Sequence, residues 1–153
     1  MPRYYNATIR NLEYRLRKFK PVLEAALKDE IKKNESIIVD LIQTQLYMGL
    51  DGYGAEIMPP YTLKTVRYKK QKHQPYDRVT LRDTGDFYRS LHVVIEEDGF
   101  RIVSDDEKAQ DLLDRYGEQV LRLMNNSLTE VIRVYLRPAL TKRMKEYVET
   151  GRT

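Results

Sequence analysis

Residues 90–103 read Ser-Leu-His-Val-Val-Ile-Glu-Glu-Asp-Gly-Phe-Arg-Ile-Val, and this stretch decides the fold class. Its apolar residues alternate with a period of two, which is typical of half-buried strands. Asp98-Gly99 lies between the two alternating runs and is a strong signal for a β-hairpin. We therefore predict strands near 88–96 and 100–104, with residues 79–81 as a further candidate for a short edge strand.

Helical periodicity flanks the hairpin on both sides. Before it, apolar residues recur at three- and four-residue steps from 9 to 46, which predicts two helices with a break just before Pro21. The second of these is expected to run for about 25 residues. After the hairpin we expect a short helix at 107–115 and a longer one, opened by the capping box Ser127-Leu128-Thr129-Glu130, which Pro138 should kink or restart near Arg137. Because two strands alone are marginally stable, a helix or another subunit must cover them.

These elements predict a single α+β domain over 1–153, with long N-terminal helices, a small antiparallel sheet and C-terminal helices. We divide it into a helical arm at 1–48, an extended loop at 49–86 and a sheet with helices at 87–149. The loop is punctuated by glycine and proline, and such a long irregular stretch in a compact domain is usually functional or ordered by a partner. A plain surface loop is the alternative, and a short helix at 61–70 fits within either.

Composition excludes several classes of protein. The chain has 153 residues, of which 41% are hydrophobic and 33% charged, so it has the size of one domain and is too apolar for a disordered chain. It has no cysteine, which excludes disulfides, thiolate zinc sites and cysteine catalysis. No apolar run approaches the roughly 20 residues that cross a membrane, and the N-terminus lacks the apolar core of a secretory signal. No phosphate-binding glycine loop, nucleophile elbow or zincin helix occurs, so we expect no enzyme activity, cofactor, metal or membrane partner.

Charge is distributed unevenly along the chain, whose formal net charge is +4. Residues 1–20 and 64–78 are basic, whereas residues 96–118 contain nine acidic and three basic residues, for a net charge of −6. A chain with separate basic and acidic faces can pair with a copy of itself. Two solvated faces are the alternative interpretation.

The stretch from 61 to 78 is also a candidate for nucleic-acid binding. It interleaves Tyr61, Tyr68 and Tyr76 with six basic residues, namely Lys64, Arg67, Lys69, Lys70, Lys72 and Arg78. Basic side chains neutralise phosphates and tyrosines stack on bases. The stretch matches no named module, so a small basic nucleic-acid-binding accessory protein is kept as the alternative function.

One segment resembles a known family. Leu81-Arg82-Asp83-Thr84-Gly85-Asp86-Phe87-Tyr88-Arg89-Ser90-Leu91 resembles the L-x-D-T-G-x-L-x-x-S-I signature of tail-completion and virion-morphogenesis proteins of tailed bacteriophages, with Phe87 in place of the usual aliphatic residue. Pro59-Pro60-Tyr61-Thr62-Leu63-Lys64 is similar to the segment that precedes the signature in that family. Tyr116-Gly117-Glu118 and Arg137-Pro138-Ala139-Leu140 are similar to elements that follow it.

The resemblance implies a structural virion protein of the head–tail junction that is made in the bacterial host cytoplasm. It would form a homo-oligomeric ring through which the genome passes, next to other neck, portal-side or tail proteins and close to DNA in the lumen. In such a ring the acidic and basic segments are expected to lie across subunit boundaries. The expected subunit or partner interface comprises Tyr61, Lys64, Arg67, Lys69, Lys70, Asp83, Thr84, Gly85, Asp105, Asp106, Asp111 and Asp114.

The residue types of the Asp83-Thr84-Gly85 motif are suited to a turn that positions the hairpin. Asp83 and Thr84 can cap a turn, and Gly85 can adopt a positive φ before the chain enters a strand. The motif is therefore expected to position the hairpin. In a ring, hairpins from successive subunits can extend one sheet around the circle and so remove exposed edges.

Overall fold

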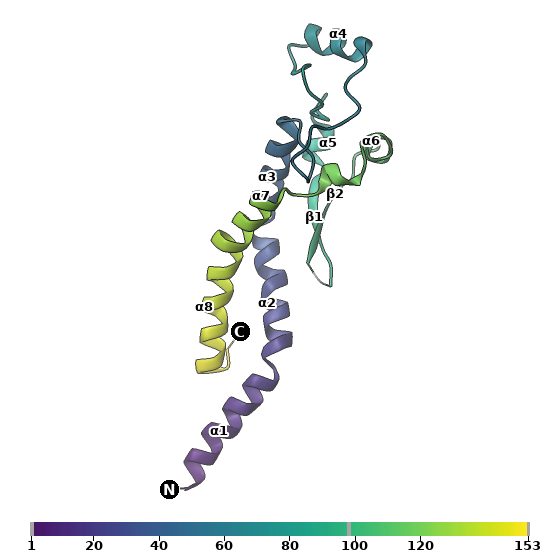
Figure 1. The fold of residues 1–153 in the computed structure, drawn as a ribbon. Helices are drawn as coiled ribbons and strands as arrows, with labels where there is room; N and C mark the ends of the chain where they lie inside the picture. Colours follow the sequence, from purple (N-terminus) through teal and green to yellow (C-terminus); the bar gives the residue numbers. More distant parts are fainter. Residues whose placement is uncertain (1, 98, 153) are drawn as a thin grey trace. The chain divides into compact units, whose positions relative to one another are not determined.

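The computed structural model describes residues 2–97 and 99–152, with side chains from residue 10 onward. The fold is a mostly helical α+β structure with N-terminal helices, a two-stranded antiparallel hairpin and a long C-terminal helix, as the sequence predicts (Figure 1). The chain divides into two compact units. We call residues 1–34 and 130–153 the helical unit and residues 35–129 the mixed unit. Their boundary at Asn34 lies inside segment 1–48, which the sequence predicts to be one helical arm.

The elements of the helical unit are α1 (Pro2–Arg17), α2 (Phe19–Lys33), a π-helical turn η2 (Val131–Leu136) and α8 (Arg137–Thr150). One apolar cluster in this unit consists of the buried residues Ala26, Met144 and Tyr147 with half-buried apolar neighbours. The predicted break before Pro21 is confirmed, because α1 and α2 meet at Lys18. The predicted restart near Pro138 is also confirmed, because this residue lies at the start of α8 and the π-helical turn comes just before it.

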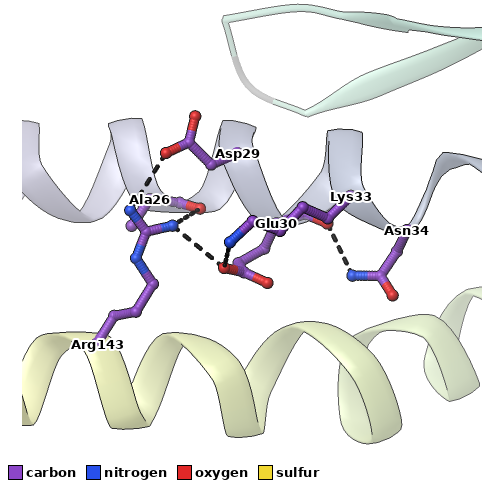
Figure 2. A network of polar contacts seen from close by, with 6 residues as sticks. All are labelled: Ala26, Asp29, Glu30, Lys33, Asn34 and Arg143. Carbon is purple, nitrogen blue, oxygen red and sulfur yellow. Dashed lines mark hydrogen bonds and ion pairs between the residues drawn. The ribbon is translucent and has the colours of Figure 1, made fainter.

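A polar network joins α8 to α2 inside the helical unit (Figure 2). The guanidinium of Arg143 donates to the Glu30 carboxylate at 3.1 Å, to the Asp29 carboxylate at 3.2 Å and to the carbonyl of Ala26 at 3.4 Å. Lys33 donates to the same Glu30 oxygen at 2.9 Å. Because Glu30 is buried, these cations stabilise a charge that burial disfavours. The hydrogen bond from Lys33, joined by that from Arg143, holds the pKa of Glu30 below its usual 4.5.

The expectation of one helix of about 25 residues after Pro21 is wrong, because Asn34 divides it into α2 and α3 (Glu35–Tyr47). Asn34 has φ −99° and ψ 14°, and its side-chain amide donates to the carbonyl of Glu30 at 2.8 Å. An asparagine that bonds a nearby backbone carbonyl competes with helical geometry. The sequence contains no glycine or proline here, so only the side-chain contact reveals the break.

The mixed unit contains α3 and all the elements between it and residue 125. These are α4 (Leu63–Gln71), α5 (Asp86–Arg89), β1 (Leu91–Ile95), β2 (Phe100–Ser104), α6 (Ala109–Tyr116) and the 3-10 turn η1 (Glu118–Leu121). Helix α3 packs against β1 and contributes a fully buried stripe of Ile38, Ile42 and Leu46. The strands pair antiparallel with Val93 opposite Ile102, and both side chains are buried. Each buried aliphatic side chain contributes roughly 1.5–3 kcal/mol, so the packing of α3 on the hairpin is a main part of the core of this unit.

The first strand begins three residues later than predicted. Residues 86–89 form the one-turn helix α5, so the strand covers only Leu91–Ile95. The hairpin closes with the N–H of Glu96 donating to the carbonyl of Gly99 at 2.9 Å, while Asp98 of the predicted turn lies outside the described residues. The candidate edge strand at 79–81 is wrong, since Leu81 has a φ of +53° that no strand accommodates.

Segment 49–86 is not a plain surface loop. It contains α4, which confirms the predicted short helix, and the isolated apolar residues Ile57, Val79 and Leu81 are buried. Its glycine-rich start packs inward, since a Cβ at Gly52 would lie 2.5 Å from the Cβ of Arg122. Single buried residues without a period leave no signal in the sequence, which is why this packing is not foreseen. Ordering of the segment by a partner stays a prediction.

The predicted capping box at Ser127 is wrong, because α7 (Asn125–Glu130) already begins two residues earlier. The chain before α7 is instead held by the buried Gln45. Its side-chain amide donates to the carbonyl of Arg122 and accepts from the N–H of Met124, both at 2.9 Å. A contact between residues so far apart in sequence cannot be recognised from local patterns.

Candidate interaction site at the Asp-Thr-Gly motif

A hollow of about 970 Å³ opens in the mixed unit beside the Asp-Thr-Gly motif. Its first wall is α4 with the turn before it, the second is the motif, and the third is the chain that runs from β2 into α6. The residues that line it are Tyr61, Lys64, Thr65, Tyr68, Lys69, Leu81, Arg82, Asp83, Thr84, Gly85, Asp86, Phe87, Ser90, Asp105, Asp106, Glu107, Lys108, Leu112 and Tyr116.

The hollow brings together most of the interface residues that the sequence predicts. Those that line it are Tyr61, Lys64, Lys69, Asp83, Thr84, Gly85, Asp105 and Asp106. Those that lie outside it are Arg67, Lys70, Asp111 and Asp114. Parts of the 64–78 basic segment and of the 96–118 acidic segment therefore face one hollow of the same chain.

The motif folds as a short capped turn. Gly85 has a φ of +92° and precedes α5, which confirms the predicted positive φ. The Thr84 hydroxyl donates to the Asp86 carboxylate, and Arg89 forms an ion pair with the same carboxylate. The hydrogen bond from Thr84 lowers the pKa of Asp86 most, and that from Arg89 lowers it further. At the end of the motif the Ser90 hydroxyl contacts the Ser104 hydroxyl at 2.6 Å, which ties the motif to β2.

Asp83 joins the motif to α4. Its carboxylate, predicted to cap the turn, accepts the hydroxyl proton of Tyr68 at 3.1 Å. This hydrogen bond raises the pKa of the Tyr68 phenol. The carbonyl of Asp83 accepts from the side-chain amide of Gln74 at 2.9 Å. The residue therefore fixes the position of one wall of the hollow relative to another.

Tyr88 of the motif is buried and bonds to the chain that precedes the motif. The Tyr88 hydroxyl donates to the carbonyl of Thr80 at 2.5 Å, and burial raises the pKa of Tyr88. The N–H of Thr80 donates to the Tyr61 hydroxyl at 2.9 Å. Tyr116 is also buried, and its pKa is raised for the same reason. Neither Tyr88 nor Tyr116 is among the interface residues that the sequence predicts, although both lie within the segments that resemble the family.

Lys69 is a buried cation in the wall of the hollow. Its ammonium donates to the carbonyl of Arg82 at 2.6 Å and to the side-chain oxygen of Gln74 at 3.2 Å. It also lies 4.9 Å from the ring centroid of Tyr61. Carbonyl oxygens and a ring face replace the water around the charge. The lysine therefore links α4 to the chain at Arg82, next to the motif.

Each tyrosine of the 61–78 stretch has a lysine of the same stretch close to its ring. Besides Lys69 over Tyr61, the pairs are Lys70 over Tyr76 at 4.6 Å and Lys72 over Tyr68 at 5.8 Å. Each ring that the nucleic-acid hypothesis offers for stacking on bases therefore has a cation of the same chain near it, while Tyr68 and Tyr76 stay 42% and 45% exposed. Lys64 and Arg67 are the basic residues of α4 outside these pairs.

The hollow combines apolar and charged side chains, as sites that bind polypeptide segments do. Its floor is formed by buried aromatic and aliphatic side chains such as Phe87 and Tyr116, and charged groups of both signs surround it. Such a site can bury an apolar side chain while polar groups at the rim fix its orientation. Among the described residues, no group of three or more histidine, aspartate or glutamate side chains converges as a metal site would require.

Comparisons of the chain with known protein families, curated proteins and solved structures find no match. Within residues 2–97 and 99–152, none of the helices has the length and apolar character needed to span a membrane.

Proposed function

We propose that the chain is a structural virion protein of a tailed bacteriophage that forms a ring at the head–tail junction, through which the genome passes. The observation that carries this proposal is the ordered set of motifs around Leu81–Leu91, whose residues resemble the tail-completion and virion-morphogenesis signature. The geometry of the motif supports a scaffolding role. Its polar side chains bond to α4, to α5 and to the end of β2, and so hold the walls of the hollow in place.

The hairpin supports assembly because one of its edges is unpaired. The N–H of Val93 in β1 donates to the Glu35 carboxylate at 2.8 Å, so this edge is covered at its centre by the start of α3. Since positions in an antiparallel pair alternate between facing the partner strand and facing away, Ile102 opposite Val93 also turns its backbone groups outward. In the described residues no strand lies beside that outer edge of β2. An unpaired edge is a template for another chain, and in a ring it receives a neighbour.

Deletion of the gene from the phage or prophage that encodes the chain tests this function. We expect negative-stain micrographs of the induced culture to show filled heads and separate tails, and expression of the chain from a plasmid to restore joined particles. Mass spectrometry of purified particles should detect the chain in several copies. Normal joined virions after deletion, or particles that consistently lack the chain, would contradict the proposal.

A further inference from the structure

The two units of the chain carry opposite net charges. The helical unit has 15 basic and 7 acidic residues, for a net charge of +8, whereas the mixed unit has 12 basic and 16 acidic residues, for a net charge of −4. Opposite charges on separate parts of one chain favour association in which the basic part of one copy meets the acidic part of the next. Such contacts are head-to-tail and close into a ring at a defined rotation.

The helical unit offers a specific surface for this contact. A groove of about 360 Å³ is lined by Leu23, Leu27, Ile132, Leu136, Leu140 and Met144, with Arg137 and Thr141 at its margin. Ile132 is 46% exposed, which is costly for an apolar side chain of this size when nothing covers it. We call this surface the α2–α8 groove.

Arg137 lines the groove and Arg133 precedes it by one helical turn, and neither has an anionic partner among the described residues. The side chains of Arg133 and Arg137 are exposed, and they form no ion pair with any residue in the part of the chain that the structure describes. This contrasts with Arg143 one turn and a half further along α8, which is neutralised by Asp29 and Glu30. An apolar groove beside two uncompensated cations fits an acidic amphipathic helix.

Helix α6 of the mixed unit is amphipathic, with its apolar residues Ala109 and Tyr116 buried in its own unit and two carboxylates on its exposed face. It carries Asp111 and Asp114 at a three-residue spacing, so both carboxylates lie on one face, and both residues are exposed. Asp114 accepts only from the uncharged amide of Gln110 at 2.7 Å, and within the described residues no cation pairs with either carboxylate. Arg115, the basic residue of α6, lies 5.3 Å from the ring centroid of Tyr116 instead.

We propose that the α2–α8 groove of one copy binds α6 of a second copy, with Arg133 and Arg137 facing Asp111 and Asp114 of that copy. The contact deepens the proposed ring function and rests on it for its biological setting. The surfaces themselves are assigned from charge and burial alone. Because the contact joins two different surfaces, every copy uses its groove toward one neighbour and its α6 toward the other.

Reciprocal charge reversal tests the contact in solution. The groove variant carries Arg133→Glu and Arg137→Glu, and the helix variant carries Asp111→Lys and Asp114→Lys. We expect sedimentation velocity to show association of the wild-type chain at low salt that weakens at about 0.5 M NaCl, where the Debye length falls below roughly 5 Å. Each variant alone should associate at least about tenfold more weakly, because like charges then face each other.

The equimolar mixture of the two variants is the decisive sample. In it, acidic grooves meet basic helices and basic grooves meet acidic helices, so association should return to within a few-fold of the wild type. A control variant with Lys142→Glu and Lys145→Glu changes the net charge equally but leaves the groove intact, and it should weaken association less than the groove variant. Recovery in the mixture also shows that both variants are folded.

Three results overturn the contact: a wild-type chain that stays monomeric at both salt concentrations, a mixture that does not recover, or a control variant as impaired as the groove variant. These failures are distinct from failure of the proposed function, which is read from deletion of the gene and from the composition of virions. A chain that joins heads to tails but fails the charge-reversal test would build its ring through other surfaces.

Discussion

Replacement of Arg143 by methionine should destabilise the helical unit by about 2–3 kcal/mol, the loss of one charged hydrogen bond to a buried carboxylate and a weaker exposed one. Methionine keeps most of the apolar stem of arginine, so the change removes mainly the charge and its hydrogen bonds. In the variant the carboxylate of Glu30, whose side chain is only 8% exposed, keeps Lys33 as its cationic partner and loses Arg143.

The magnitude follows from the three contacts of the guanidinium. The hydrogen bond to buried Glu30 contributes about 1.5–3 kcal/mol, as is usual for hydrogen bonds to charged groups. The ion pair with Asp29, whose side chain is 61% exposed, adds about 0–1 kcal/mol. The 3.4 Å contact with the carbonyl of Ala26 is too long to add much. Retention of Lys33 keeps the total below the full cost of an isolated buried charge.

Urea unfolding followed by circular dichroism at 222 nm measures this loss, with an expected decrease of about 1–2 M in the midpoint. The matched control is Arg17→Met in the same unit, because Arg17 pairs with Glu13 across an exposed i,i+4 spacing and should contribute only about 0.3–0.5 kcal/mol. Adding Glu30→Gln to the Arg143 variant should recover part of the loss, since the buried charge is then gone. Equal effects of the two arginine substitutions would refute the reasoning.

Four further predictions concern pH, backbone geometry, a buried hydroxyl and DNA. Because the folded-state pKa of Glu30 lies below its usual 4.5, the stability it contributes is present above about pH 4.5 and is lost as the pH falls through the folded pKa, so the wild-type and Arg143 variant unfolding curves should converge once the pH is below that folded pKa. Gly85→Ala should cost about 1–2 kcal/mol in thermal unfolding because alanine resists a φ of +92°, whereas Gly85→Asn should cost less. Tyr88→Phe should cost about 1–3 kcal/mol in urea because a buried carbonyl loses its donor; an unchanged midpoint would show that water replaces the hydroxyl. In gel retardation at 0.15 M NaCl, a Lys64→Ala, Arg67→Ala variant should shift a 20-base-pair duplex no less than the wild type, and a clear loss of retardation would favour the nucleic-acid alternative.

The hairpin and most helices follow from local patterns. Alternation of apolar residues around Asp98-Gly99 identifies two strands because side chains on a strand point to opposite faces, and only one face of this hairpin is buried. The three- and four-residue steps identify the helices for the same geometric reason. Pro138 correctly marks the restart of α8 because a residue without an N–H disturbs the helical ladder.

The predictions from sequence are wrong where a side-chain contact overrides the local sequence pattern. Asn34 interrupts a helix by bonding a backbone carbonyl, and the Ser127 capping box lies inside a helix that starts earlier. Local propensity does not reveal either outcome, because both depend on which partners the chain brings near. The buried residues of segment 49–86 escape notice for a related reason, since Leu81 and its neighbours pack singly rather than along a repeating face.

In the candidate site, too, the sequence predicts some residues, whereas their arrangement depends on the tertiary structure. Gly85 is recognisable in advance because few other residues adopt a positive φ at low cost, and Asp83, Lys69 and Tyr61 are selected from motif and composition. Their joint position around one hollow depends on contacts such as that of Tyr68 with Asp83, which link residues fifteen positions apart. Dihedral preferences and apolar periodicity determine secondary structure along the chain. Which distant segments come into contact depends instead on which surfaces can exclude water together. This choice of contacts is made only when the whole unit packs.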